Sequence, residues 1–163
     1  MLRMNEVQPI RSCEKIAEIK DKLKHKSYRD YFLFVMGINT GLRISDLLPL
    51  KVEDVRNKTH ITIKEKKTDK TKRFVINGAL RQEIEEYTQN MKDHDYLFRS
   101  QRTFEPIKRV QAYKILNKVA KEVGLDEIGT HTLRKTFGYH YYKKTKDVAM
   151  LQEIFNHSAP SVT

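Results

Sequence analysis

The sequence predicts a mainly α-helical fold with one small antiparallel β-sheet, an α+β domain. Two observations predict it: most of the chain spaces its apolar residues three or four apart, whereas residues 60–64 and 72–76 alternate polar with β-branched or aromatic residues. No internal repeat or low-complexity linker interrupts the pattern, and 163 residues are enough to bury a core. We therefore expect a single domain over residues 1–163.

The first helix is marked by its cap and by one apolar face. Ser12 can accept a hydrogen bond from a backbone N–H of the first helical turn, a position at which serine is strongly preferred. The residues that follow place an apolar stripe at helical spacing, made of Ile16, Ile19 and Leu23. This face of the helix should pack against the core.

A second helix should run through the longest apolar stretch of the chain. Ser27, followed three residues later by Asp30, is a variant of the capping box that opens a helix. Residues 31–36 are apolar nearly all round a helix, which predicts that this helix is buried. Gly41 then breaks it.

A change of period follows a short third helix. Arg43 begins that helix, and Pro49 limits it. Residues 60–64 and 72–76 then alternate and are rich in β-branched side chains, which predicts two strands of a hairpin. A loop over residues 65–71 should join the strands.

Helical spacing returns after the hairpin. Helices are expected over residues 79–91 and 107–123, and Gly124 supplies the stop of the second one. Two further helices should follow, near residues 132–144 and 147–155.

The charge balance favours a polyanionic partner. The chain has 32 basic and 21 acidic residues, a net charge of +11 and a pI near 9.7. Nucleic acid is the commonest partner of such a surface, although a basic surface that serves only solubility is the alternative. No helix combines a strongly apolar face with a wholly basic one, so a membrane surface is not the expected partner.

Cysteine usage and the absence of a leader predict a soluble cytoplasmic protein. Cys13 is the single cysteine, which excludes an internal disulfide, and no signal peptide or membrane-length apolar run is present. Four of the histidines have no cysteine or carboxylate partner at zinc-like spacing, so no metal site is predicted; they are His25, His60, His94 and His140.

Two arginines and two histidines carry the chemistry that the sequence suggests. Arg43 lies in Thr-Gly-Leu-Arg-Ile-Ser-Asp (40–46), His131 and Arg134 lie in Thr-His-Thr-Leu-Arg (130–134), and His157 ends Leu-Gln-Glu-Ile-Phe-Asn-His (151–157). Guanidinium groups grip phosphate oxygens with a fork of donors, and histidines pass protons near neutral pH. A His-x-x-Arg spacing alone is weak, since it usually belongs to a solvated helix face.

The three stretches together, in this order and at these separations, resemble the catalytic domain of the tyrosine recombinases, the family of phage integrases and Xer-type resolvases. The resemblance covers essentially the whole chain and implies the integrase-type DNA breaking-rejoining fold. It implies that Arg43 and Arg134 hold the non-bridging oxygens of a DNA phosphodiester. His131 would help to deprotonate the nucleophile, and His157 would donate to a phosphate oxygen.

A basic hairpin is the fourth element of the resemblance. Lys67 aligns best with the hairpin lysine that protonates the leaving 5′-oxygen in this family, and Lys66 and Lys70 remain candidates for that role. Asp46 would support the site rather than react. The other basic side chains of the hairpin are expected to bind DNA: Lys66, Lys70, Lys72 and Arg73.

The resemblance also implies a reaction and an assembly. A tyrosine hydroxyl attacks double-stranded DNA, forms a 3′-phosphotyrosyl bond and frees a 5′-hydroxyl, with no metal or other cofactor, and a homo-tetramer works on two sites. The family places its nucleophile nine residues after the position of His157, and none of the eight tyrosines lies there. Tyr139, Tyr141 and Tyr142 lie too close to Arg134 and should only pack or contact DNA.

These features predict an incomplete catalytic domain of an integrase, without the N-terminal core-binding domain and the C-terminal nucleophile segment. Such a chain should bind DNA weakly, cleave nothing and be monomeric. Two alternatives stay open at this point: a type IB topoisomerase-like enzyme, which relaxes DNA without pairing two sites, and a non-catalytic DNA-binding module.

Overall fold

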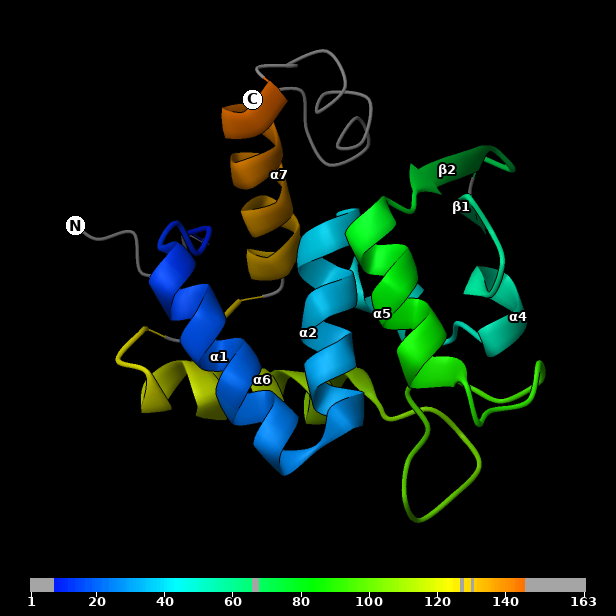
Figure 1. Cartoon of the computed structure of the whole chain (residues 1–163), viewed down its shortest axis with the longest axis horizontal. Helices are drawn as coiled ribbons and strands as arrows, with labels where there is room; N and C mark the ends of the chain where they lie inside the picture. The colour runs from blue at the N-terminus through cyan, green and yellow to red at the C-terminus, as the bar shows by residue number, and fades with distance from the viewer. Residues whose placement is uncertain (1–7, 66–67, 127, 130, 146–163) are drawn as a thin grey trace.

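The computed structural model describes residues 8–65, 68–126, 128–129 and 131–145, and it confirms the mainly helical α+β prediction (Figure 1). A two-stranded antiparallel sheet follows four helices and precedes three more within these residues. The elements in chain order are α1 (Cys13–Lys26), α2 (Tyr28–Thr40), α3 (Ile44–Leu47), α4 (Val52–Val55), β1 (His60–Lys64), β2 (Thr71–Val75), α5 (Gly78–Thr88), α6 (Arg109–Glu122) and α7 (Thr132–Thr145).

The predicted N-terminal caps of the first two helices are both present. The Ser12 side chain accepts a hydrogen bond from the backbone N–H of Lys15 at 3.2 Å, and the Ser27 side chain accepts one from Asp30 at 3.3 Å. Gly41 ends α2 in the left-handed conformation, with φ of 77°. These local signals confirm the predicted start of both helices and the end of α2.

Helix α2 is the centre of the core. Its residues 30–37 are all buried, as the continuous apolar run predicted. It packs against α1, α5 and α7, and Figure 1 shows it between α1 and α5 with α7 above. Any side chain that α2 positions is therefore held on several sides.

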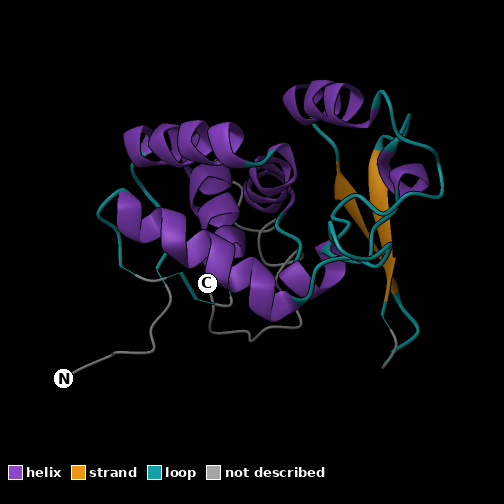
Figure 2. Cartoon of the chain, turned by 90° about the horizontal axis from the view of Figure 1, so that it is seen from below, coloured by secondary structure: helices purple, strands orange, loops and turns teal. Residues whose placement is uncertain are grey.

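The hairpin lies at one side of the helices (Figure 2). Its register pairs Ile61 with Phe74 and Ile63 with Lys72. Ile61 and Phe74 are both buried, which anchors one face of the hairpin on the body of the domain. The second strand begins at Thr71 and ends at Val75, one residue earlier than predicted at each end.

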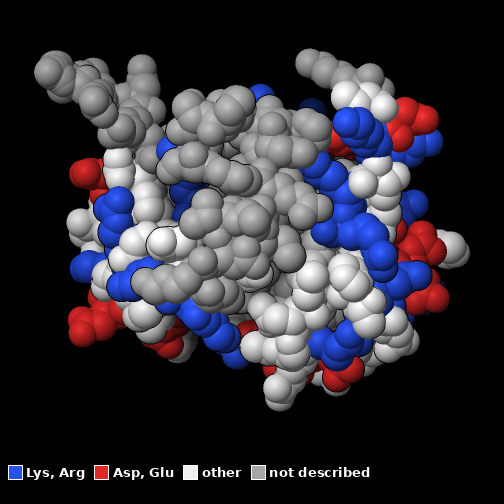
Figure 3. Space-filling model, turned by 90° about the horizontal axis from the view of Figure 1, so that it is seen from above, with Lys and Arg blue, Asp and Glu red and all other residues white. Residues whose placement is uncertain are grey.

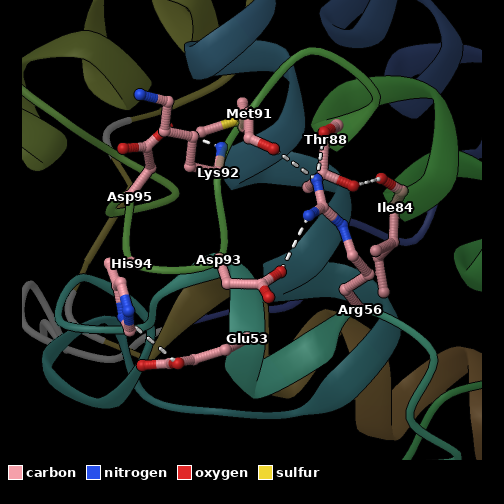
Figure 4. Close-up of polar contacts among 9 residues, drawn as sticks. All are labelled: Glu53, Arg56, Ile84, Thr88, Met91, Lys92, Asp93, His94 and Asp95. Carbon is pink, nitrogen blue, oxygen red and sulfur yellow. Dashed lines mark hydrogen bonds and ion pairs between the residues drawn. The ribbon is translucent and has the colours of Figure 1, made fainter.

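Helix α5 ends at Thr88, three residues before the predicted end, where the side chain of Arg56, the C-cap residue of α4, binds the last carbonyl of the helix. Arg56 donates hydrogen bonds to the backbone oxygens of Thr88 and Met91 and forms an ion pair with Asp93 at 2.9 Å (Figure 4). The chain turns tightly there, with Met91 N–H donating to Thr88 O at 2.9 Å. A hydrogen bond from Arg56, which lies outside α5, thus satisfies the carbonyl at the end of α5.

Two further boundaries differ from the predictions. The predicted helix over 107–123 starts only at Arg109, because Ile107 N–H donates to Phe98 O at 2.8 Å in an extended pairing. Gly124, with φ of 79°, follows its end as expected. Helix α4 was not predicted at all; Asp54 caps it by accepting from the N–H of Lys51 at 2.8 Å.

The predicted helix over 147–155 lies outside the described residues. Within the part of the chain that the structure describes, no helix is long and apolar enough to cross a membrane.

Candidate DNA-phosphate site

A buried turn after α2 presents Arg43. The hydroxyl of Thr40 donates to Met36 O at 2.7 Å and accepts from Leu42 N–H at 3.1 Å, so it closes the turn from inside. Gly41 supplies the positive φ that this turn requires, and Leu42 is 2% exposed in the core. Arg43 follows directly as the N-cap residue of α3, half-buried and fixed by the turn before it.

The first turn of α7 presents the second arginine. His131 immediately precedes the helix, and its backbone oxygen accepts from Lys135 N–H at 2.8 Å. The Thr132 hydroxyl accepts from Gly129 N–H at 2.8 Å, which fixes the chain as it enters α7. Arg134 is therefore in the first turn, three residues after His131, as the sequence predicted.

The structure brings Arg43 and Arg134 together although they are 91 residues apart (134 − 43). Burial is the main cause that lowers the pKa of Arg134 to about 10, the positive charge of Arg43 adds to it, and Asp46 opposes it. Arg134 is 5% exposed and still cationic at neutral pH. The buried guanidinium of Arg134 and the half-buried guanidinium of Arg43 repel each other, so the site favours an anion between them.

His131 belongs to the same cluster. Burial lowers its pKa below the usual 6.5, and the charges of Arg134, Arg43 and Lys135 lower it further. The imidazole is therefore neutral at pH 7 and can accept a proton. A bound phosphate would raise its pKa again, because an anion favours the protonated form.

Asp46 lies among these cations, one turn after Arg43. Burial raises its pKa, whereas Arg43 and Arg134 lower it, and Glu65 raises it. The carboxylate thus offsets part of the positive charge where the arginines meet. We refer to Arg43, Asp46, His131 and Arg134 as the clamp.

The described basic residues of the hairpin differ in position. Lys72 is half-buried and interacts electrostatically with Arg43 and Arg134, whereas Lys70 and Arg73 are exposed. Figure 3 shows a band of Lys and Arg side chains on the side of the molecule that carries the hairpin. Lys66, Lys67 and His157 lie outside the described residues.

Sequence reasoning did not assign two participants. Glu65 interacts with both Asp46 and Lys72, and Lys135 adds positive charge beside His131. Lys72, by contrast, was assigned to DNA binding, and it shares a strand face with Phe74. No comparable sequence signal marks Glu65, which follows β1 in the loop.

No group of three or more potential metal ligands occurs among the described residues. Two of the four clamp residues, Arg43 and Arg134, carry guanidinium groups, which bind phosphate oxygens and are not metal ligands. Asp46 and His131 are residue types that can bind a metal.

Comparison with known proteins decides the family. A family model described as the phage integrase family matches residues 9–163. The chain belongs to the phage integrase family.

Curated relatives of this phage integrase family member include two named recombinases. The chain is 60% identical to the "Probable integrase/recombinase YoeC" of Bacillus subtilis (strain 168) over 160 residues, covering 98% of the chain and 88% of that protein. It is 30% identical to the "Tyrosine recombinase XerA" of Pyrococcus horikoshii over 154 residues, covering 92% of the chain and 52% of that protein. The chain spans about half the length of several other curated relatives as well.

Solved structures share the fold of this integrase family member. A crystal structure of XerA recombinase matches with a TM-score of 0.79 at 22% identity, covering 96% of the chain and 58% of that protein. A lambda integrase tetramer bound to a Holliday junction matches with a TM-score of 0.70 at 16% identity, covering 96% of the chain and 49% of that protein. These matches confirm the predicted integrase-type catalytic fold.

Proposed function

We propose that the chain is the catalytic unit of a site-specific DNA recombinase and that the clamp holds the DNA phosphodiester at which strands are exchanged. The observation that supports this most is the convergence of Arg43 and Arg134 from distant segments around one buried position. Two guanidiniums stabilise a phosphodiester better as it gains charge in the transition state than before it reacts. The recombinase names of the relatives support the same activity.

The proposed reaction is a transfer of the phosphoryl group to a tyrosine. A tyrosine hydroxyl loses its proton with the help of His131 and attacks phosphorus, and the bond to the 5′-oxygen breaks as the 3′-phosphotyrosyl bond forms. Lys67 gives its proton to the leaving 5′-oxygen, and His157 donates a hydrogen bond to a non-bridging oxygen. The 5′-hydroxyl of another strand then reverses the step.

Neutral His131 and cationic Arg134 suit these different roles. The lowered pKa of His131 keeps the imidazole able to accept a proton at pH 7, while Arg134 at about 10 keeps its charge. The exposed basic residues of the hairpin, Lys70 and Arg73, would bind flanking phosphates. Assembly on two DNA sites as a tetramer is proposed for the full protein, whereas this chain without DNA should sediment as a monomer.

A suicide-substrate assay tests the proposal. Nicked duplexes carrying the ends of the element are incubated without metal with this chain and with the full product of its gene, and covalent protein–DNA adducts are sought on denaturing gels. We expect an adduct with the full product that Arg134→Ala abolishes. Folded protein that binds DNA and forms no adduct on the correct substrate would instead identify a non-catalytic DNA-binding module.

A further inference from the structure

The second hairpin strand presents its basic side chains to opposite sides. Side chains alternate along a strand, so Lys72 shares one face with Phe74, whereas Arg73 lies on the other. Phe74 is 7% exposed and lies opposite buried Ile61, which identifies this face as the one turned to the core. Lys72 is half-buried on that face, and Arg73 is exposed.

The inward face of the hairpin meets the clamp. Lys72 interacts electrostatically with Arg43 and Arg134 and with the carboxylates of Asp46 and Glu65. Asp46 in turn interacts with Arg43, Arg134, Glu65 and Lys72. Five charged side chains from α3 and its N-cap, the hairpin and the first turn of α7 therefore form one cluster.

We propose that Lys72 is a third cation of the phosphate site and contacts the same phosphodiester as Arg43 and Arg134, with Glu65 as its counter-charge before DNA binds. This inference rests on the function proposed above and adds a residue to that site. Three cations and two carboxylates leave one net positive charge, which matches the single negative charge of a phosphodiester. Binding of the phosphate would then displace Lys72 from Glu65 toward the DNA.

The pKa values of the cluster agree with this arrangement. Burial lowers the pKa of Lys72, the charges of Arg134 and Arg43 lower it further, and Glu65 opposes this. A cation held near two others in a partly buried place costs free energy that a bound anion recovers. The charge of Lys72 is therefore stabilised more by a bound phosphate than by the surroundings it has without one.

Two other basic residues of the hairpin have partners of their own in the described part of the chain. Lys64 pairs with Asp69 at 3.0 Å on the exposed side, and Arg73 lies 3.4 Å from the ring of His60. Lys58, before β1, is exposed and carries the same charge, so it provides a matched control.

Binding of this chain to a duplex of about 20 base pairs, in a salt series, tests the inference. We expect Lys72→Ala to lower the affinity about tenfold, as loss of a charge-assisted hydrogen bond does. Lys72→Arg should stay within about threefold of the wild type, because it keeps the charge, and Lys58→Ala within about twofold.

A double-mutant cycle decides whether the phosphate is shared. If Lys72 and Arg134 bind one phosphate, Lys72→Ala combined with Arg134→Ala should differ from the product of the single losses by about threefold or more. Independent losses would overturn the inference, as would a Lys72→Ala affinity equal to that of Lys58→Ala. Lys72→Gln replaces Lys72→Ala if thermal unfolding shows that the alanine variant does not fold.

The substitution Glu65→Gln provides an independent test of the inference in the same DNA-binding assay. Removing the counter-charge should raise the affinity severalfold in the wild type and have no effect in Lys72→Ala; an equal effect in both would overturn the role of Glu65. A wild-type chain without salt-dependent DNA binding would overturn the proposed function itself. If the wild type and Arg134→Ala respond as expected and Lys72→Ala does not, only the inference about Lys72 fails.

Discussion

Gly37 on α2 and Leu133 on α7 touch so closely that a Cβ on Gly37 would lie 2.5 Å from Leu133 Cδ1 and 3.1 Å from its Cβ. This contact sets how near the two helices approach. Arg43 follows the end of α2, and Arg134 is the next residue after Leu133. The missing side chain at position 37 therefore helps to bring the two arginines of the clamp together.

Gly37→Ala should destabilise the protein despite the better helix propensity of alanine. Propensity would contribute about 1 kcal/mol in favour of the variant, but overpacking against Leu133 costs about 1–3 kcal/mol. We expect a net loss of up to about 2 kcal/mol in the free energy of unfolding, measured by urea denaturation. In a Leu133→Ala background the same substitution should stabilise, and a stabilised single variant would contradict the close contact.

The lowered pKa of His131 predicts a loss of stability on the acid side. Between the folded-state pKa and about 6.5, the unfolded chain binds more protons than the folded one, so the free energy of unfolding rises with pH in this window. It should fall as the pH drops below 6.5. Urea denaturation from pH 5 to 7.5 should show a shallower dependence for His131→Gln than for the wild type; parallel curves would reject this account.

Thr136 joins the segment before α1 to the helix that carries Arg134. Its buried hydroxyl accepts from Ile10 N–H at 2.9 Å and donates to Thr132 O at 2.7 Å, while His140 Nε2 lies 2.9 Å from Ile10 O. Thr136→Val should cost about 1–3 kcal/mol, because the buried Ile10 N–H loses its acceptor. Hydrogen exchange at the Ile10 amide should speed up in this variant and remain slow in Thr136→Ser.

Arg56 is expected to matter far more than its ion-pair partner. Arg56→Ala removes the Arg56 donor from the Met91 carbonyl and one of two donors from the Thr88 carbonyl, at a cost of about 1–3 kcal/mol in the free energy of unfolding. The partner Asp93 is 63% exposed, so Asp93→Ala should cost less than about 1 kcal/mol. Equal losses in thermal or urea denaturation would assign the stabilisation to the ion pair instead.

Local signals in the sequence predicted most of the helix boundaries. Ser12, Ser27 and Gly41 act on the residues next to them, so their effects could be inferred without the fold. The end of α5 could not be inferred, because it depends on Arg56, 32 residues before Thr88. Helix α4 has four residues, too few for a periodic pattern to emerge.

Part of the candidate site could likewise be predicted from the sequence, and part of it could not. The residue patterns around Arg43 and Arg134 made both arginines candidates for the site, and the structure places them in one cluster. The position of Lys72 relative to the arginines depends on how the hairpin packs on the helices. The alternation of side chains placed Lys72 on the face of Phe74 and Arg73 on the other, but the sequence alone could not show that this face lies beside Arg43 and Arg134.

The distance in sequence between Arg43 and Arg134 also affects when a chain that is being synthesised can bind nucleic acid. A ribosome releases the turn after α2 and the hairpin long before α7, and contacts between distant segments form late in folding. A nascent polypeptide with Arg43 but without Arg134 has half of the phosphate site beside a large surplus of ribosomal RNA. Because α7 packs on Gly37, we expect strong anion binding only after translation has passed Arg134.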